Sequence, residues 1–347
     1  MSYYFNNWLG GGPSEQLHLR WQLQGRSQHM ALNGLLDIQI AVSNPQELFD
    51  FWLQHGMSAT SDGVLGTPDR PVQMQISEGT YRHLSSMHLS CDTEADIAAI
   101  AKRLADAGIA STSDSTTVRC VDPVFGHSIV IDVGSPHSLT PTQTRAFNGP
   151  GERTRINTRA DAVLHTQSPV VRRVGHVVLG TPHLAEAVDF YSNVLGYRIS
   201  DQIMKGFATF MRVESDHHNL MIQPGPTSYL NHYAVEVDDI DAVGLAGTNA
   251  LKDERVSSVI GVGRHNLGAN VFWYLRDPSG NMFEFFSDMD QIVDEELWDR
   301  VHRRLDWEGE DGPAGFAAWG PNEPPVEFFS PSDLPSIAAA REASGLK

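Results

Sequence analysis

The chain has 347 residues, of which 41% are hydrophobic and 20% charged, a composition typical of a globular protein with room for two domains. Its formal net charge of −18 disfavours binding to nucleic acid or anionic membranes, because affinity for phosphate depends on concentrated Lys and Arg. No apolar run approaches the roughly 20 residues of a membrane helix, and only two cysteines occur, so we expect a cytoplasmic protein with a small, neutral or weakly ionised ligand.

The first part of the chain contains one pattern twice, after a polar arm. Residues 1–30 include a glycine run, and we interpret them as an arm that packs on the body or on a neighbouring subunit. A first domain is predicted at 31–138. Its segments are a strand at Leu36–Val42, a helix from Pro45 to Gly56 behind an Asn44 cap, a strand at Ser86–Asp92, a helix at Glu94–Gly108, and strands near 116–123 and 127–133.

The same order returns beyond a linker. Residues 139–172 are rich in Ser, Thr, Pro and Arg, which is typical of a linker. The segments that follow are a strand and helix at Gly175–Tyr197, strands at 207–213 and 218–224, a strand and helix at 231–251, and a hairpin at 263–286. His232 aligns with His88, so the chain is an internal duplication in which each half contains two βαβββ-like units. This pattern predicts an α+β protein with a second domain at 173–290.

The last segment, 291–347, contains an amphipathic helix at Asp294–Trp307 and then an acidic, proline-rich tail. We interpret this segment as a packing and assembly element, and we expect a homo-oligomer.

The hairpin at 263–286 contains a polar interruption. A DPSG turn at Asp277–Gly280 joins two apolar runs, and Glu284 stands among Met and Phe residues in the second run. An ionised carboxylate in such surroundings costs several kcal/mol unless it meets a cation or a metal. With the turn centred near Ser279, Tyr274 lies opposite Glu284 on the neighbouring strand.

Three polar residues interrupt apolar strands at corresponding places in the second half. They are His176, His232 and Glu284, separated by 56 and 52 positions, about one for each structural unit. Two imidazoles and one carboxylate on separate strands form the ligand set of a non-haem iron(II) site with open coordination positions. Each histidine taken singly is more often a core or surface residue, but their joint recurrence in a repeat favours a metal site.

These residues, with Gly-Arg-His at 263–265 and the motif Y-x-x-D-P-x-G-x-x-x-E ending at Glu284, resemble the type I extradiol ring-cleaving dioxygenases of the vicinal oxygen chelate superfamily. The resemblance implies two tandem vicinal oxygen chelate domains, each a curved, partly open sheet around a central cavity. It implies iron(II), with manganese(II) as the less common ion, in the second domain and no metal in the first. The first-half counterparts are Asp37, His88 and an apolar position near Ile129 or Val130, which would leave that site incomplete.

The resemblance also implies three catalytic residues. His218 falls where the family has a histidine near the dioxygen position, and His265 and Tyr274 fall where it has groups that bind the substrate oxygens. A neutral imidazole can take a proton from a catechol and return it, and a phenol can stabilise developing charge. We expect His217, the other half of a histidine pair on a strand, to point away from the site.

The implied reaction is extradiol cleavage of a catechol-type aromatic by dioxygen, which gives a ring-opened semialdehyde or keto acid. Two alternatives use the same fold: a metal-dependent, glyoxalase-like isomerase, and a protein that binds an aromatic compound without catalysis. The joint presence of His218, His265 and Tyr274 favours the dioxygenase.

Overall fold

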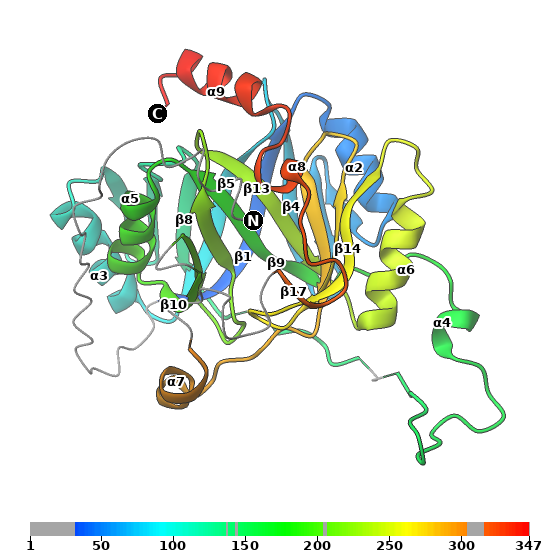
Figure 1. Cartoon of the computed structure of the whole chain (residues 1–347). Helices are drawn as coiled ribbons and strands as arrows, with labels where there is room; N and C mark the ends of the chain where they lie inside the picture. The colour runs from blue at the N-terminus through cyan, green and yellow to red at the C-terminus, as the bar shows by residue number, and fades with distance from the viewer. Residues whose placement is uncertain (1–31, 137, 143–144, 204–206, 304–315, 347) are drawn as a thin grey trace.

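In a computed structural model, the chain forms two large sheets side by side with helices on their outer faces (Figure 1). The structure describes residues 32–136, 138–142, 145–203, 207–303 and 316–346. The predicted arm at 1–30 lies outside these residues. Within them, no helix is both long and apolar enough to cross a membrane.

Two βαβββ units make the first half. The first comprises β1 (Leu32–Val42), α2 (Pro45–Gln54), β2 (Ser58–Ser61), β3 (Val64–Thr67) and β4 (Arg70–Glu78). The second comprises β5 (His83–Cys91), α3 (Glu94–Asp106), β6 (Ser111–Ser113), β7 (Thr117–Val121) and β8 (Ser128–Val133). The short helix α4 (Asp161–Leu164) lies in the stretch between the two halves.

The second half repeats the arrangement. Its first unit comprises β9 (Arg173–Thr181), α5 (Leu184–Asp189) continued by the π-helical turn η1 (Phe190–Leu195), β10 (Arg198–Ile203), β11 (Ala208–Arg212) and β12 (Leu220–Pro224). Its second comprises β13 (Tyr229–Glu236), α6 (Ile240–Ala250), β14 (Ser257–His265), β15 (Val271–Arg276) and β16 (Met282–Ser287). The chain ends with α7 (Glu295–Leu297), η2 (Trp298–His302), β17 (Ala317–Trp319), α8 (Val326–Phe329) and α9 (Leu334–Ala343).

Strand order confirms the internal duplication and the α+β fold. The first sheet runs β2-β3-β4-β1-β5-β8-β7-β6, and the second runs β10-β11-β12-β9-β13-β16-β15-β14-β17. Apart from β17, the two orders are the same. In each sheet the first strands of the two units, β1 with β5 and β9 with β13, pair antiparallel at the centre. Residues on these central strands therefore meet in the middle of each sheet.

The two halves share one hydrophobic core. Helix α2 of the first half packs on β16 of the second, where the Trp52 ring lies 5.2 Å from Phe283 and 6.0 Å from Phe285. Trp52 also donates a hydrogen bond to the Tyr233 hydroxyl at 3.1 Å. Because side chains alternate along a strand, Phe283 and Phe285 toward α2 place Glu284 on the opposite face of the sheet.

The hairpin has the register that its sequence predicts. β15 and β16 pair antiparallel with Tyr274 opposite Glu284. Asp277 holds the turn, because its Oδ1 accepts from the backbone N–H of Ser279 at 2.8 Å and of Asn281 at 3.0 Å. Its Oδ2 accepts from the Tyr233 hydroxyl at 2.8 Å, so the turn is tied to β13.

The third first-half counterpart is Asp132, and the prediction of an apolar residue near Ile129 or Val130 was wrong. In the second half His232 pairs with Met282, and Glu284 follows two residues later on β16. In the first half His88 pairs with Val130, so Asp132 on β8 corresponds to Glu284. The spacing from His88 to Asp132 is shorter than that from His232 to Glu284 because loops of different length separate the strands, so the position follows from strand pairing rather than from spacing.

His88 lies between two carboxylates at this position. Its Nδ1 is 2.8 Å from Asp37 Oδ2, and its Nε2 is 2.8 Å from Asp132 Oδ2. Burial by itself would lower the pKa of His88, but the hydrogen bonds and charges of Asp37 and Asp132 outweigh it and raise the pKa. Both imidazole nitrogens are engaged by acids, so the first half has an ion triad where the second half has the three residues described below.

This triad should make stability depend on pH. The pKa of His88 is raised above its unfolded value of about 6.5, so its contribution is complete below that pH and is lost as pH rises through the raised pKa. We expect His88→Gln to lower the free energy of unfolding by roughly 1–2 kcal/mol in mild acid, and by less in mild alkali. Denaturant unfolding at several pH values measures the difference. His183→Gln, at an exposed position, is the control, and an equal loss at every pH for His88→Gln would contradict this assignment.

Candidate active site

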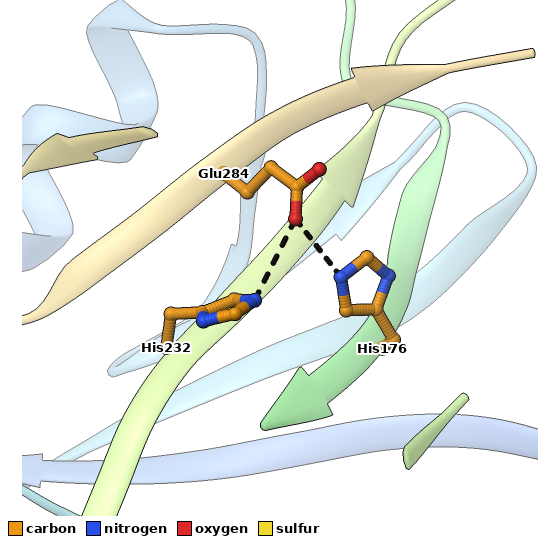
Figure 2. Close-up of side chains that lie close together, drawn as sticks. All are labelled: His176, His232 and Glu284. Carbon is orange, nitrogen blue, oxygen red and sulfur yellow. Dashed lines mark hydrogen bonds and ion pairs between the residues drawn. The ribbon is translucent and has the colours of Figure 1, made fainter. Parts of the chain in front are cut away.

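Three adjacent strands bring His176, His232 and Glu284 together (Figure 2). His176 is on β9, His232 on β13 and Glu284 on β16. Ala234 of β13 pairs with His176 on one side and with Glu284 on the other. His232 precedes Ala234 by two positions and so lies on the same face. The side chain that stands between them on this face, that of Ala234, is small.

The three side chains converge and are almost fully buried. The exposed fraction is 1% for His176, 3% for His232 and 0% for Glu284. Glu284 Oε2 lies 3.0 Å from His176 Nε2 and 3.6 Å from His232 Nε2. One nitrogen or oxygen atom from each residue lies within 4.8 Å of the others, and among the described residues these three form the group that meets this criterion for holding a metal ion.

The proton on His232 can be placed from its neighbours. Asn231 Nδ2 donates to the Phe328 carbonyl at 2.8 Å, so Asn231 Oδ1 is the atom that faces His232 Nδ1 at 2.7 Å. An amide oxygen only accepts, so His232 Nδ1 carries the proton and Nε2 keeps its lone pair. Burial lowers the pKa of His232 to about 4, so the ring is neutral near pH 7. A nitrogen lone pair therefore faces the Glu284 carboxylate.

This arrangement fits a divalent metal ion. His232 Nε2 and His176 Nδ1 are buried without a hydrogen-bond partner in the described part of the chain, and such atoms are costly. Burial alone would raise the pKa of Glu284, but His176 and the other nearby imidazoles outweigh it and lower the pKa. A cation among the three residues would satisfy both the lone pair and the carboxylate, and two imidazoles with one carboxylate suit iron(II).

Asn270, which the sequence analysis missed, holds the other oxygen of the carboxylate. Its Nδ2 donates to Glu284 Oε1 at 2.8 Å, and the residue is fully buried. The main chain around it is fixed because the His265 N–H donates to the Asn270 carbonyl at 3.0 Å. A lone Asn before an apolar run has no sequence signal for this role, since the contact depends on how the β14–β15 connection folds over β16.

His265 and Tyr274 form a hydrogen-bonded pair beside Glu284. His265 Nδ1 lies 3.0 Å from the Phe316 carbonyl, so it is the donor nitrogen, and Nε2 accepts from the Tyr274 hydroxyl at 2.8 Å. Burial, and then the charge of Glu284, raise the pKa of Tyr274 well above its usual range. Burial lowers the pKa of His265. At neutral pH the pair therefore has no net charge, and the single phenol proton is engaged by His265 Nε2.

His218 adjoins His176, with the two rings 4.4 Å apart. Burial, and then the neighbouring histidines, lower the pKa of His218 well below its usual range. The prediction that His217 and His218 lie on a strand was wrong. His217 and His218 are in the loop before β12 rather than on a strand, so strand alternation does not apply, and their Nδ1 atoms are 3.1 Å apart.

The C-terminal segment, which we interpreted only as a packing and assembly element, covers this site. Strand β17 pairs with β14, with Ala317 opposite His265. The Phe316 ring lies 4.6 Å from His265, and the Phe328 ring lies 5.1 Å from Tyr274. Two aromatic rings from the end of the chain therefore adjoin the predicted catalytic residues. Their role could not be predicted from the sequence because no periodicity indicates which surface a tail covers.

Comparison with known proteins agrees with this fold. Residues 173–285 match the model of the Glyoxalase/Bleomycin resistance protein/Dioxygenase superfamily. Metapyrocatechase 2 of Cupriavidus necator is 31% identical over 270 residues, covering 75% of this chain and 79% of that protein. An iron-dependent extradiol dioxygenase of Rhodococcus jostii (strain RHA1) is 26% identical, covering 65% and 77%. A Mn(II)-bound glyoxalase of Novosphingobium aromaticivorans superposes with a TM-score of 0.66 at 21% identity, covering 86% and 94%.

Paired βαβββ modules with His and Glu converging on central strands define a protein of this superfamily. Within it, the chain belongs to the extradiol dioxygenase family, as the resemblance in the sequence indicated. It is therefore an oxidoreductase that cleaves an aromatic ring with dioxygen.

Proposed function

We propose that the chain binds iron(II) through His176, His232 and Glu284 and opens a catechol-type substrate beside its two hydroxyl groups. The observation that carries this proposal is the His232 Nε2 lone pair, which faces the Glu284 carboxylate at 3.6 Å with no proton on that nitrogen. A divalent cation between the two residues would accept the nitrogen lone pair and offset the charge of the carboxylate. Manganese(II) suits the same donors.

The residues around these three would have separate roles in binding the substrate and in moving its protons. Bound iron(II) supplies the redox chemistry that lets dioxygen react with an aromatic diol. Tyr274 gives its single proton to His265 Nε2, which holds the phenol in place, and its oxygen presents lone pairs that can accept a hydrogen bond from a substrate hydroxyl on the Glu284 side. His218, neutral and next to His176, accepts a proton from a hydroxyl and returns it to an oxygen of the opening ring. The product is a semialdehyde or a keto acid.

Phe316 and Phe328 support an aromatic substrate. Their rings lie 5.1 Å apart at 80° and both face Tyr274, so a flat ring held by Tyr274 would meet aromatic edges rather than charge. A buried, mainly apolar enclosure also keeps water away from reactive intermediates.

Anaerobic reconstitution with a panel of catechols tests the proposal. Protein purified without oxygen should take up one iron(II) or manganese(II) per chain, and adding air with a catechol should give the yellow ring-opened product. Measured uptake of one dioxygen per product separates cleavage from isomerisation. Metal uptake with no oxygen consumption on any catechol, but with turnover of a glyoxalase-type substrate, would support the isomerase alternative. Failure to bind either metal would support the non-catalytic alternative.

We also propose that copies of the chain associate through the segment between the two halves. This segment extends away from the body around α4 (Figure 1). Phe147, Ile156, Val163 and Leu164 in it are between 54% and 65% exposed, which is unusual for large apolar side chains grouped in one segment. Sedimentation of the full chain at the mass of a single copy would exclude this assembly.

A further inference from the structure

A row of three buried polar side chains leads away from the site behind His218. Asp201 Oδ2 lies 2.7 Å from His217 Nε2, and His217 Nδ1 lies 3.1 Å from His218 Nδ1. The exposed fractions are 2%, 0% and 4% along this row. Asp201 comes from β10 and the two histidines from the loop before β12, so the row joins two separate segments of the sheet's edge.

The direction of the hydrogen bonds along the row follows from the Asp201 carboxylate at its end. A carboxylate only accepts, so His217 Nε2 carries a proton toward Asp201. A neutral imidazole has one N–H, so His217 Nδ1 is an acceptor, and His218 Nδ1 must be the donor in the 3.1 Å contact. His218 then keeps a lone pair on Nε2. The opposite tautomer of His218 would place two lone pairs against each other.

The surroundings hold this row in place and leave no space for a side chain beside it. A Cβ added at Gly268 would lie 3.0 Å from His217 Nδ1 and 3.3 Å from His218 Nδ1, so the Gly268 backbone closes directly over the contact between the rings. Gly268 also has a φ of +81°, which disfavours other residues. The Gly268 carbonyl accepts from the Asp290 N–H at 2.8 Å, and the His217 N–H donates to the Asp290 carbonyl at 2.9 Å. The Trp298 ring lies 5.7 Å from His217.

We propose that Asp201 and His217 are positioning residues that hold His218 in the tautomer with its proton on Nδ1, so that Nε2 is free to accept the proton of a substrate hydroxyl. The proposal rests on the proposed role of His218. When the hydroxyl O–H bond breaks and an Nε2–H bond forms, the positive charge on His218 faces His217 and, through it, the Asp201 carboxylate. The returning proton leaves the same nitrogen, so the row ends each turnover as it began.

The direct test is Asp201→Asn, which keeps the shape but can present an N–H to His217 and so reverse the row. Where a carboxylate fixes the tautomer of an imidazole, replacing it with an amide removes much of the activity. For a residue that acts through a hydrogen bond to another residue, the expected loss of activity is about 10- to 100-fold. We expect kcat to fall by this factor with KM and metal content unchanged, and Asp201→Glu to recover part of the loss.

Asp216→Asn is the matched control. Asp216 directly precedes His217 and is also buried, but it pairs with Arg173 rather than with the histidines. It should change stability more than kcat. Equal kcat values for Asp201→Asn and the parent enzyme, or an equal loss in Asp216→Asn, would overturn the proposal.

A second readout does not depend on turnover. Nitrogen-15 NMR of the histidine rings, in the full chain loaded with diamagnetic zinc, distinguishes the two tautomers. The His218 signals should report a proton on Nδ1 in the parent and a mixed or reversed tautomer in Asp201→Asn. The opposite tautomer in the parent would overturn the proposal. Full activity of a His218→Gln variant would instead remove the proposed role of His218 on which the row depends, so the two failures are distinguishable.

Discussion

Glu284→Gln should bind iron(II) more than about 100-fold more weakly than the parent chain, a larger loss than that from an outer hydrogen-bond partner, and should have no measurable ring-opening activity. The change keeps the volume of the side chain and its contact with Asn270, but it removes the negative charge that faces His176 and His232. A neutral amide cannot offset a divalent ion in a buried site, where charge separation is costly. Metal analysis after dialysis under nitrogen, with an anaerobic titration of iron(II), measures the loss.

The control for Glu284→Gln is Glu214→Gln. Glu214 is a mostly buried carboxylate of the same half that pairs with Arg173. This variant should keep its iron and its activity, whereas circular dichroism should show that both variants are folded. Normal iron affinity in Glu284→Gln would remove Glu284 from the metal site and with it the proposed ligand set.

His218→Ala is expected to separate metal binding from turnover. His218 contacts the ring of His176 but is not within the group of three atoms that converge. Its loss should therefore leave one metal per chain and a similar KM, because the diol would still meet the same donors. General acid–base groups contribute typically 10²- to 10⁴-fold to rate, so kcat should fall by at least about 10²-fold.

Steady-state oxygen uptake at saturating catechol measures this change, with His183→Ala at an exposed position as the control. A His218→Ala variant that loses its iron would show that His218 supports the metal rather than the reaction. A variant with full iron and unchanged kcat would show that another group handles the proton.

The candidate metal ligands could be picked out of the sequence because they are polar residues within apolar strands. Glu284 between Met and Phe residues and His176 in an apolar strand are conspicuous because buried polar groups need partners. Strand alternation then fixed which residues share a face, and the DPSG turn fixed the register of Tyr274 with Glu284. These are local properties, carried by the period of two in a strand and by the geometry of a short turn.

The third counterpart in the first half could not be placed from the sequence. It was expected near Ile129 or Val130, whereas strand pairing puts Asp132 there. His217 was wrongly expected on a strand: the residue lies in a loop, where the alternation rule does not hold. Its partner Asp201 is 16 positions away on another strand, and no pattern in the sequence links the two.

The sequence by itself determined the duplicated βαβββ units and the hairpin register, and it indicated His176, His232 and Glu284 as candidate ligands, because each follows from short-range period, turn chemistry or the cost of burying a polar group. His218 and His265 were indicated by the family resemblance instead. Only the tertiary structure decided which contacts support those residues: the Phe328 carbonyl that orients Asn231 beside His232, Asn270 beside Glu284, and the C-terminal rings of Phe316 and Phe328 next to His265 and Tyr274. Such contacts depend on how loops and a chain end fold across a finished sheet. Hydrogen-bond direction is then set by atoms far apart in the sequence, which no local pattern encodes.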